Sequence, residues 1–490
     1  MDHLDRRISR RKFLEWSAKA TAGTLVLNGF TDGCFAMASP SSQPPIPLDV
    51  LIVGGGVQGL WTLRALQSLG FSVAVVERGT LGGAQTCHSH VYIHGGHLYY
   101  GDFELAARLR DANSEWTSFV RDADPERGVV LSVFGFSNEA EVAERLVFWD
   151  DPRLRLPYER TVVPPILQGG TISHVLKTPE YALNGGSMML KLADIRDAMS
   201  KINDIRRIHL TSDAMSVSAV DISMPDGRTV TIQPRALVLA AGAGNQRLLE
   251  LVSEGDRGLL AKMRGIQHIR KAHMLVIKGP KRLLQPLAGI FPKVGGLFIG
   301  SRVVGDDTVW LVSDDRSPHL EEPEDWINYD ERWWLPRTIQ SLERVAPKTF
   351  ESKDALRWGV YAAPKAEVRT PAFETRRDWV QQFGVRNLWA VWPAKLTLAP
   401  LAALEIASAI KDHLQMPGPA LPGQWREIRV PVSTAPELWE KTPILPWKEF
   451  RHAFELALAV PGRRRSRSAV LQDVSCEFVD LHLASAPRCA

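Results

Sequence analysis

The sequence predicts an α/β protein in which a parallel sheet is combined with a separate antiparallel sheet. Three features lead to this prediction. The run at 48–53 is short, apolar and rich in branched residues, which is typical of a buried parallel strand. A glycine-rich turn follows it and leads into apolar residues at helical spacing, from Leu60 to Leu69. Later segments between 272 and 315 have the pattern of strands in a second sheet.

The turn after the first strand, Gly54-Gly55-Gly56-Val57-Gln58-Gly59, fits the pattern GxGxxG. In such a turn Gly54 permits the tight bend, Gly56 lets a pyrophosphate approach the backbone, and Gly59 lets helix and strand pack closely. The helix that follows offers free N–H groups and a partial positive charge at its N-terminus. The turn therefore indicates a phosphate-binding site.

A second strand at 71–79 contains Glu77, 18 residues beyond Gly59. A carboxylate at that distance can accept hydrogen bonds from ribose hydroxyls. Because the glycine turn lies between a strand and a helix and is followed by this acid, the pattern predicts dinucleotide binding and not merely a glycine-rich loop.

The segment 80–100, TLGGAQTCHSHVYIHGGHLYY, stands where a nicotinamide-binding domain would have a crossover helix. Together with the glycine turn it resembles flavoproteins of the D-amino-acid oxidase superfamily, in which this segment runs along the flavin. IHGGHLYY is similar to FAD-dependent glycerol-3-phosphate dehydrogenases, and QTCHSHVYIHGG to L-2-hydroxyglutarate dehydrogenases. The resemblance implies a Rossmann-type FAD-binding domain of the glutathione-reductase-like kind with an inserted antiparallel-sheet substrate domain.

Two later segments carry the same resemblance. The segment 234–252 is predicted as a strand ending in Ala240-Ala241-Gly242 and then a helix, similar to the second FAD-contacting turn of these flavoproteins. The segment 387–410 resembles the part that approaches the flavin pyrimidine edge, although Ala394-Lys395-Leu396 replace the usual glycines. The resemblance thus assigns FAD contacts to Gly54, Gly56, Val57, Gln58, Gly59, Glu77, Arg78, Gln85, Thr86, His88, Ser89, Ala241, Gly242, Lys395, Leu396 and Thr397.

The predicted organisation is a discontinuous FAD domain with a substrate domain inserted between its pieces. A hairpin is expected at 215–233, turning at Asp226-Gly227, together with a helix at 324–347 and a strand at 354–364. The expected ranges are a signal peptide at 1–38, a linker at 39–47, FAD-binding pieces at about 48–125, 185–265 and 365–415, substrate-domain pieces at about 126–184 and 266–364, and a partly disordered extension at 416–490.

The N-terminus predicts export by the twin-arginine route. Ser9-Arg10-Arg11-Lys12-Phe13-Leu14 matches that signal, a mildly apolar run at 18–30 follows, and Ala36-Met37-Ala38 resembles a cleavage site. The alternative is an amphipathic N-terminal helix. The resemblance to twin-arginine signals implies a cargo that folds before it crosses the membrane. A protein that must bind its cofactor in the cytoplasm suits this route. We therefore expect a periplasmic protein that has the export machinery as a partner.

Four histidines lie in the flavin segment, at positions 88, 90, 94 and 97. Each can be a structural hydrogen-bonding residue, and one can touch flavin or substrate. His94 is the first catalytic candidate because it occupies the IHGG position. A metal site is not expected, since the extended glycine-rich context fits a flavin contact better and the chain has no CxxC pair. A covalent link of FAD to His88 or Cys87 remains open.

An anionic substrate would need a cationic side chain to bind it. Arg357 and Arg302 lie on predicted strands of the substrate domain, and of these Arg357 is the predicted catalytic-site residue. Each can equally be an ordinary packing or surface arginine. Lys395, near the presumed pyrimidine edge, is placed to stabilise a reduced flavin anion.

Composition and missing motifs exclude other classes. The net charge of +4 over 490 residues gives no case for nucleic-acid binding. No GxSxG elbow supports a serine hydrolase. We predict an FAD-dependent oxidoreductase that transfers hydride from a small amine, amino acid or hydroxy acid to flavin and passes electrons to O2 or a membrane quinone. The alternatives are a hydroxy-acid or glycerol-phosphate type dehydrogenase that uses quinone and an exported flavin-binding protein without a substrate.

Overall fold

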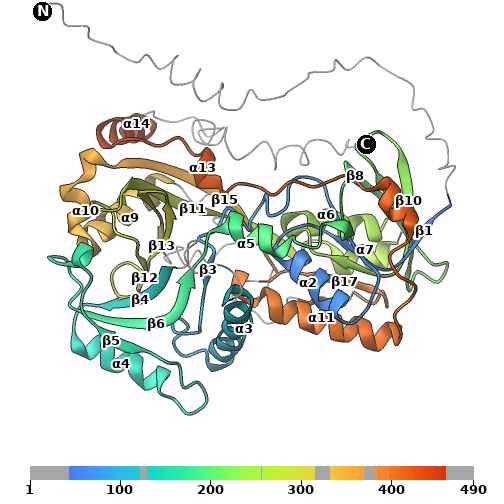
Figure 1. Cartoon of the computed structure of the whole chain (residues 1–490), viewed down its shortest axis with the longest axis horizontal. Helices are drawn as coiled ribbons and strands as arrows, with labels where there is room; N and C mark the ends of the chain where they lie inside the picture. Colours follow the sequence, from blue (N-terminus) through green and yellow to red (C-terminus); the bar gives the residue numbers. More distant parts are fainter. Residues whose placement is uncertain are drawn as a thin grey trace, which may run out of the picture.

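The computed structural model describes residues 44–121, 130–254, 256–314, 331–368, 380–381, 383–393 and 395–459. These residues form two lobes, each built on its own sheet (Figure 1). The helix α3 (Phe103–Arg121) lies between the lobes in this view. The predicted signal peptide at 1–38 lies outside the described residues, as does the tail beyond residue 459.

The first lobe contains a sheet of order β16-β17-β10-β1-β2-β7, extended by β9 and β8. Its central strands β10, β1 and β2 pair in parallel, as the apolar run at 48–53 predicted. The predicted hairpin is formed by β9 and β10, and Gly227 has a positive φ of 87° in its turn. The strands are β1 (Ile46–Val53), β2 (Val73–Glu77), β7 (Met199–Lys201), β8 (Asp204–Leu210), β9 (Val217–Ser223), β10 (Thr229–Leu239), β16 (Val380–Gln381) and β17 (Leu388–Val391).

Helices cover both faces of this sheet. On one face α2 (Val57–Ser68) and α11 (Ala399–Leu414) share a buried core with Val50 and Ile52. On the other face α6 (Asn245–Val252) and α7 (Arg257–Met263) pack against the side chains of β1 that point the other way, among them Leu51. The result is the three-layer arrangement expected of a doubly wound sheet.

The second lobe contains a sheet of order β18-β15-β11-β14-β13-β12-β4-β6-β3, to which β5 adds beside β6. Most neighbouring strands are antiparallel, and β12 with β4 is a parallel pair. The strands are β3 (Tyr92–Ile93), β4 (Val130–Phe136), β5 (Glu159–Thr161), β6 (His174–Ala182), β11 (Gln267–Pro280), β12 (Ala288–Phe291), β13 (Leu297–Val304), β14 (Asp307–Asp314), β15 (Arg357–Val368) and β18 (Leu445–Pro446).

Two groups of helices pack on this sheet. The helices α9 (Glu331–Val345), α10 (Pro347–Glu351) and α14 (Trp447–Ala459) cover one part, where Trp310 and Trp358 are fully buried. The helix α4 (Glu139–Trp149) covers another part and buries its own Trp149. The predicted helix at 324–347 is thus present from Glu331, and its first residues lie outside the described ranges.

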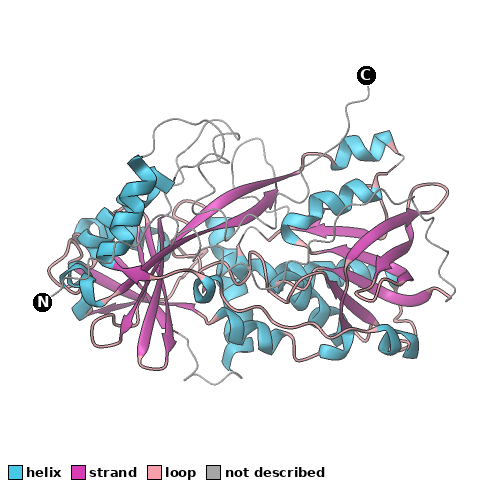
Figure 2. Ribbon diagram, turned by 90° about the horizontal axis from the view of Figure 1, so that it is seen from above, coloured by secondary structure: helices cyan, strands magenta, loops and turns pink. Residues whose placement is uncertain are grey.

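Three features join the lobes. The long strands β11 and β15 run from the second lobe towards the first (Figure 2), and Ala366 of β15 is buried in the core of the first lobe. The short strand β3, which directly follows the histidine-rich turns, belongs to the second sheet. The helix α5 (Gly185–Leu192) packs into the core beneath α2. The flavin segment therefore lies at the junction of the two lobes.

Residues 416–459 of the predicted extension are described by the structure and are held to the rest of the fold at separate points, whereas 460–490 lie outside the described residues. Gly418 donates its N–H to the buried Asp49 of β1, at 3.0 and 2.9 Å from the two carboxylate oxygens. The helix α12 (Gly423–Ile428) buries Trp425 in the first lobe, and α13 (Leu438–Lys441) packs beside the flavin segment. The segment lacks hydrophobic periodicity, so these isolated anchors could not be read from its sequence pattern.

Glu437, which precedes α13, forms a buried ion pair with Arg302 of β13. Both side chains are fully buried, and Arg302 Nε lies 2.8 and 3.0 Å from the two oxygens of Glu437. Glu437 also accepts hydrogen bonds from the N–H of Gly185 at 3.1 Å and from the indole N–H of Trp439 at 2.8 Å. One carboxylate thus connects β13, the start of α5 and the C-terminal segment.

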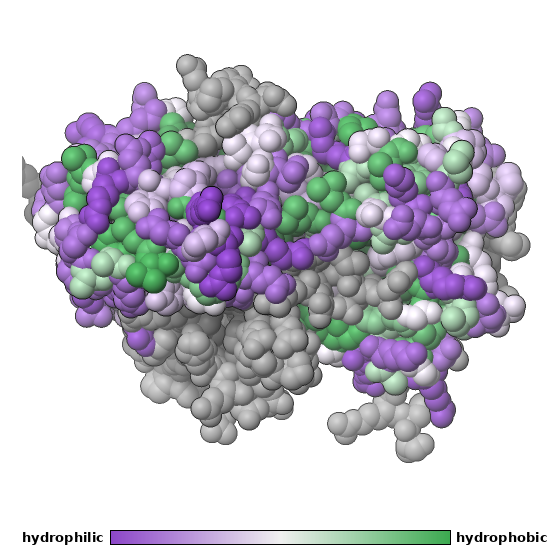
Figure 3. Space-filling view, turned by 90° about the horizontal axis from the view of Figure 1, so that it is seen from below, coloured by the Kyte–Doolittle hydropathy of each residue, from purple (hydrophilic) through white to green (hydrophobic). Residues whose placement is uncertain are grey.

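None of the described helices combines the length and the apolar character needed to cross a bilayer. Figure 3 shows hydrophobic residues on one face in separate groups among hydrophilic ones.

Breaking the buried ion pair will destabilise the protein strongly. Glu437→Ala leaves Arg302 charged and without its carboxylate in the core, so we expect the free energy of unfolding to fall by about 3–5 kcal/mol. Replacing both residues with apolar ones, Arg302→Met with Glu437→Leu, should recover most of this loss. Urea denaturation measures both. The control is Glu455→Ala, which breaks an exposed Arg451 pair and should cost no more than about 0.5 kcal/mol. Equal losses for the two glutamates would contradict the assignment.

Candidate functional site

The glycine turn has the geometry that a bound pyrophosphate requires. Gly54 has a φ of 114°, and a Cβ there would stand 2.5 Å from the carbonyl oxygen of Ala240. A Cβ on Gly59 would overlap the carbonyl oxygen of Gly54. Gly56 is the N-cap of α2 and provides no side-chain cap. The start of α2 therefore has backbone N–H groups that can face an anion, and the backbone can be approached closely.

Glu77, at the end of β2, is held against the same turn. Its Oε2 accepts the N–H of Gly55 at 2.7 Å and its Oε1 accepts the N–H of Gly79 at 2.6 Å. A carboxylate oxygen has more than one acceptor site, so these bonds leave room for ribose hydroxyls. Arg78 is exposed beside it and lies close enough to Asp204 to interact with that charge.

Thr86 of the flavin segment completes the glycine turn. Its buried hydroxyl accepts the N–H of Val57 at 3.2 Å, so it takes one of the first donors of α2. Gln58 is also buried and bonds to Thr62 within the helix at 3.1 Å. The turn and the flavin segment are thereby fixed to each other although 29 residues separate the bonded atoms.

The second predicted block forms a tight turn after β10. Gly242 has a φ of 55°, and the N–H of Ala241 donates to Asn245 Oδ1 at 2.8 Å. The Asn245 amide then donates to the carbonyl of Val391 at 3.0 Å. This asparagine, which the sequence analysis did not single out, connects the ends of β10 and β17 at the carboxyl edge of the parallel sheet, where dinucleotides bind in this type of fold.

The third block meets the flavin segment directly. Thr397 is fully buried, its hydroxyl accepts the N–H of His94 at 2.9 Å, and its carbonyl accepts the indole N–H of Trp116 at 2.9 Å. Leu396 packs against the core of the first lobe, and the Lys395 ammonium lies 5.2 Å from the ring centre of Tyr99. Residues far apart in sequence are therefore brought together at the N-terminus of α11.

The flavin segment is irregular, and side chains hold its backbone. Gln85 accepts the N–H of Ala366 from β15 at 3.0 Å. Ser89 donates to the carbonyl of Thr86 and accepts the N–H of Val91. Val91 has a φ of 48°, a conformation that is strained for a β-branched residue. Such a strained conformation persists only where neighbouring contacts hold the backbone in place, as the hydrogen bond from Val91 to Ser89 does here.

Cys87 and His88 occupy positions at which a covalent link to FAD remained open. Burial, followed by the nearby Glu437 charge, raises the pKa of the Cys87 thiol to about 12. The thiol therefore stays protonated at neutral pH and is a poor nucleophile. Burial and the charge of Lys441 lower the pKa of His88 to about 4, and its Nδ1 is buried without a hydrogen bond. His88 is thus neutral at pH 7.

His94 lies in an aromatic enclosure at the junction of the lobes. Its ring centre is 4.8 Å from that of Tyr92, 5.6 Å from Tyr99 and 5.9 Å from Phe298. Burial lowers its pKa to about 4, because the lowering by burial and by the charges of Lys395 and Lys365 exceeds the opposing effect of Glu180. His94 is therefore uncharged at neutral pH and able to accept a proton.

Glu180 of β6 lies behind His94 and was missed by the sequence analysis. The carboxylate is fully buried and accepts the N–H of Gly95 at 2.6 Å, the ring Nδ1 of His97 at 3.0 Å and the hydroxyl of Tyr92 at 3.0 Å. Burial raises the pKa of Glu180, but the hydrogen bond and charge of His97, helped by His94, outweigh burial and lower it overall. Glu180 is thus a buried anion.

The two arginines considered for binding an anionic substrate, Arg302 and Arg357, lie elsewhere in the structure. Arg302 is not available to a substrate because its guanidinium pairs with Glu437 and donates to the His90 carbonyl at 2.6 Å. Arg357, the predicted catalytic residue, is exposed at the start of β15. Nine residues separate it from Ala366, which contacts the flavin segment, and that corresponds to about 30 Å along a strand. The structure does not bring Arg357 to the site, since the strand runs away from the lobe junction.

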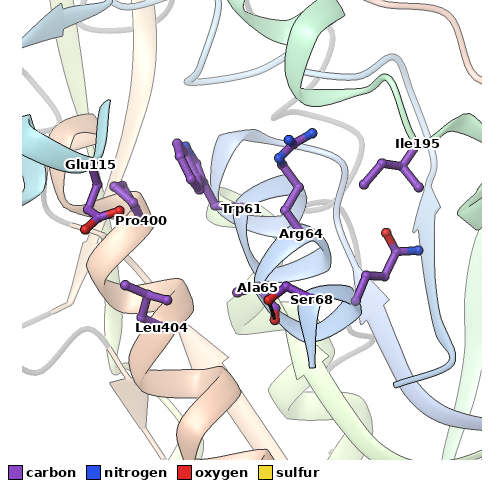
Figure 4. A pocket seen from close by; sticks show the side chains of 9 residues that line it. Trp61, Arg64, Ala65, Ser68, Glu115, Ile195, Pro400 and Leu404 are labelled. Atoms are coloured by element: carbon purple, nitrogen blue, oxygen red, sulfur yellow. Dashed lines mark hydrogen bonds between the residues drawn. The ribbon is translucent and has the colours of Figure 1, made fainter. Parts of the chain in front are cut away.

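A cavity of about 490 Å³ is lined by residues of α2, α3 and α11 (Figure 4). Trp61 and Arg64 of α2 line it on one side and Pro400 and Leu404 of α11 on the other. A second cavity, of about 280 Å³, is lined by Gly95 and His97 together with residues of α3 and two prolines. Within the described ranges, no cluster of three or more His, Cys, Asp or Glu side chains is arranged to hold a metal ion.

Comparison with known proteins agrees with this geometry. The family model of the FAD dependent oxidoreductases, DAO, matches residues 49–409. The chain belongs to this family. A relative from Pseudomonas aeruginosa, described as a probable FAD-dependent oxidoreductase, is 25% identical over 380 residues, which is 74% of this chain and 91% of the relative.

Solved structures show the same fold. The crystal structure of an FAD dependent oxidoreductase from Pseudomonas aeruginosa has a TM-score of 0.59 at 21% identity and covers 81% of this chain and 99% of its own. The structure of L-proline dehydrogenase from P. horikoshii has a TM-score of 0.57 at 13% identity, and the match covers 78% of this chain and 97% of that protein. The structure of glycine oxidase from Geobacillus kaustophilus has a TM-score of 0.54 at 16% identity, and the match covers 77% of this chain and 97% of that protein.

The family cofactor FAD fits the residues of this site. The glycine turn would hold its pyrophosphate against the start of α2, and Glu77 would accept its ribose hydroxyls. The chain is accordingly an FAD-dependent oxidoreductase. When bound, FAD supplies a two-electron acceptor for a hydride from a substrate carbon.

Gly59→Ala will prevent FAD binding. Its methyl group would overlap the Gly54 carbonyl, so strand and helix must separate and the pyrophosphate site is lost. We expect at least a tenfold fall in the ratio of bound FAD to protein, measured from the absorbance spectrum after purification. Gly423→Ala is the matched control, because nothing lies within 4 Å of a Cβ there. A yellow Gly59→Ala protein with full FAD content would refute the assignment of the turn.

Proposed function

We propose that this protein oxidises a small amine, amino acid or hydroxy acid by hydride transfer to FAD. The observation that carries the proposal is His94, a neutral and largely buried base enclosed by aromatic rings where the flavin segment meets the N-terminus of α11. Solved neighbours with this fold include proteins named L-proline dehydrogenase, glycine oxidase and L-amino acid deaminase. Their names support an amine or amino acid as the substrate class.

Positive charge near His94 supports an anionic substrate. The charges of both Lys395 and Lys365 act on the His94 ring, and Lys365 forms a largely buried ion pair with Glu367 that a substrate carboxylate would have to share. These lysines replace Arg357 as the proposed partners of a substrate carboxylate, because they lie at the lobe junction. The aromatic rings of Tyr92, Tyr99 and Phe298 would exclude water around the reacting carbon.

Two alternatives remain. One is an L-2-hydroxy-acid or glycerol-phosphate type dehydrogenase, favoured by His94 because an alcohol must lose a proton as hydride leaves. The other is a flavin-binding protein without a substrate. For electron acceptors we propose O2 or a membrane quinone, since soluble nicotinamide is not expected outside the cytoplasm, and this part of the proposal depends on export.

Anaerobic reduction tests the proposed activity. The yellow protein is mixed without oxygen with amines, amino acids and hydroxy acids in turn, and loss of the flavin absorbance is followed. We expect bleaching by at least one amino acid or hydroxy acid, and Lys365→Met should weaken the apparent affinity for that anion about tenfold or more because it removes a nearby positive charge. Bleaching by hydroxy acids alone, with none by amines or amino acids, favours the dehydrogenase, and no bleaching by any compound favours the binding protein.

We further propose that the protein is exported to the periplasm through the twin-arginine machinery. The sequence motif at Arg10 and Arg11 supports this proposal. Changing both arginines to lysine should hold the protein in the cytoplasm, because the paired arginines are the feature that the export pathway recognises. Fractionation followed by immunoblotting measures the distribution. An unchanged periplasmic fraction in the double variant would overturn the proposal.

A further inference from the structure

The two oxygens of the Glu180 carboxylate accept different numbers of hydrogen bonds. Oε1 accepts the N–H of Gly95 at 2.6 Å, the N–H of His97 at 3.2 Å and His97 Nδ1 at 3.0 Å. Oε2 accepts the hydroxyl of Tyr92 at 3.0 Å. Nδ1 of His94 also faces Oε2, at 3.9 Å. This oxygen therefore has acceptor capacity directed at the His94 ring.

His94 Nδ1 is buried and makes no hydrogen bond. A lone pair directed at a buried carboxylate would be repelled, whereas an N–H there would be attracted. Nδ1 therefore carries the proton of the neutral ring, and Nε2 keeps the lone pair. The distance of 3.9 Å is too long for a hydrogen bond, and catalytic contacts of this kind commonly shorten only when cofactor and substrate are bound.

His97 keeps Glu180 ionised. Its Nδ1 faces Glu180 at 3.0 Å and its Nε2 faces the carbonyl of Pro157 at 3.0 Å. The Pro157 contact fixes the ring so that Nδ1 points at Glu180, and this hydrogen bond lowers the pKa of the carboxyl group against the effect of burial. Without His97, burial would raise the pKa of Glu180, and a protonated Glu180 would lose its attraction for His94 N–H.

We propose that Glu180 is a positioning residue for His94: Oε2 receives the Nδ1–H of His94, fixes that tautomer, and leaves Nε2 to take the proton of the substrate. The inference rests on the proposed function for the identity of the proton donor. A substrate C–H leaves as hydride with two electrons to FAD, and its O–H or N–H proton passes to His94 Nε2. The product is a carbonyl compound or an imine, so charge and atoms balance.

This arrangement favours one substrate class. An amine that is already unprotonated can lose hydride without a base, whereas an alcohol must transfer a proton as well. A buried carboxylate that aligns a neutral histidine is therefore needed for an alcohol and unnecessary for a free amine. We infer that the substrate is a hydroxy acid or another small anionic alcohol, with Lys365 and Lys395 near its charge.

The tautomer of His94 is measured by ¹⁵N NMR of the FAD-bound protein labelled at histidine. The His94 signals are those missing in His94→Asn. We expect the Nδ1–H form in the parent protein, and the Nε2–H form in Glu180→Gln, whose amide N–H₂ can face Nδ1. Asp221→Asn is the matched control, because Asp221 bonds to the distant His209 at 2.7 Å and should alter that ring alone.

Two NMR outcomes would overturn the proposal. One is an Nε2–H tautomer of His94 in the parent protein, which needs no variant and is decisive even if Glu180→Gln does not fold. The other is an unchanged His94 tautomer in folded Glu180→Gln. Glu180→Asp keeps the charge and should retain the Nδ1–H form at least in part, which separates loss of the carboxylate from a general disturbance of the fold.

Kinetics provide the second readout. With a hydroxy acid that bleaches the flavin, Glu180→Gln should slow flavin reduction by about 10²–10⁴-fold and change KM little. An equally fast variant would refute the inference. If the NMR result is as expected but nothing reduces the flavin, the proposed function fails and the positioning of His94 stands. If amines alone reduce the flavin and Glu180→Gln has no effect, the proposed function stands and this inference fails.

Discussion

The site depends on one constraint: an irregular segment crosses the buried junction of two sheets, where backbone groups need partners. Residues 80–91 form no extended ladder, so side chains provide those partners. Thr86 accepts the first N–H of α2, Ser89 supports the strained Val91, and Arg302 holds the His90 carbonyl. Each of these side chains is fixed by its own contacts. The cradle for the cofactor is therefore made by tertiary interactions and not by local secondary structure.

Buried charges give this junction its specificity. Arg302 with Glu437 and His97 with Glu180 are two fully buried pairs on either side of the flavin segment. Each carboxylate also accepts a backbone N–H, of Gly185 and Gly95 respectively. The carboxylate of Glu437 connects β13 of the second lobe with the start of α5, whereas Glu180 and His97 both belong to the second lobe. They also place neutral His94 beside a fixed negative charge.

The sequence predicted the parts of the fold that local patterns encode. The glycine turn, the parallel strand before it and the hairpin at 215–233 each depend on a few adjacent residues. Glu180 was not predicted, because it lies 83 residues from His97 and nothing in its own strand marks it. Glu437 lies in a segment without hydrophobic periodicity, and the place of Arg357 at the far end of β15 could not be read from that strand alone.

The position of Glu437 has a consequence for biosynthesis. The anchor Glu437 is translated long after the glycine turn at 54–59. A nascent chain on the ribosome can form the first βαβ unit early, yet Arg302 keeps an uncompensated charge until residue 437 has been translated and has left the exit tunnel. Stable capture of the cofactor therefore has to wait until residue 437 has been translated, long after the glycine turn has been made.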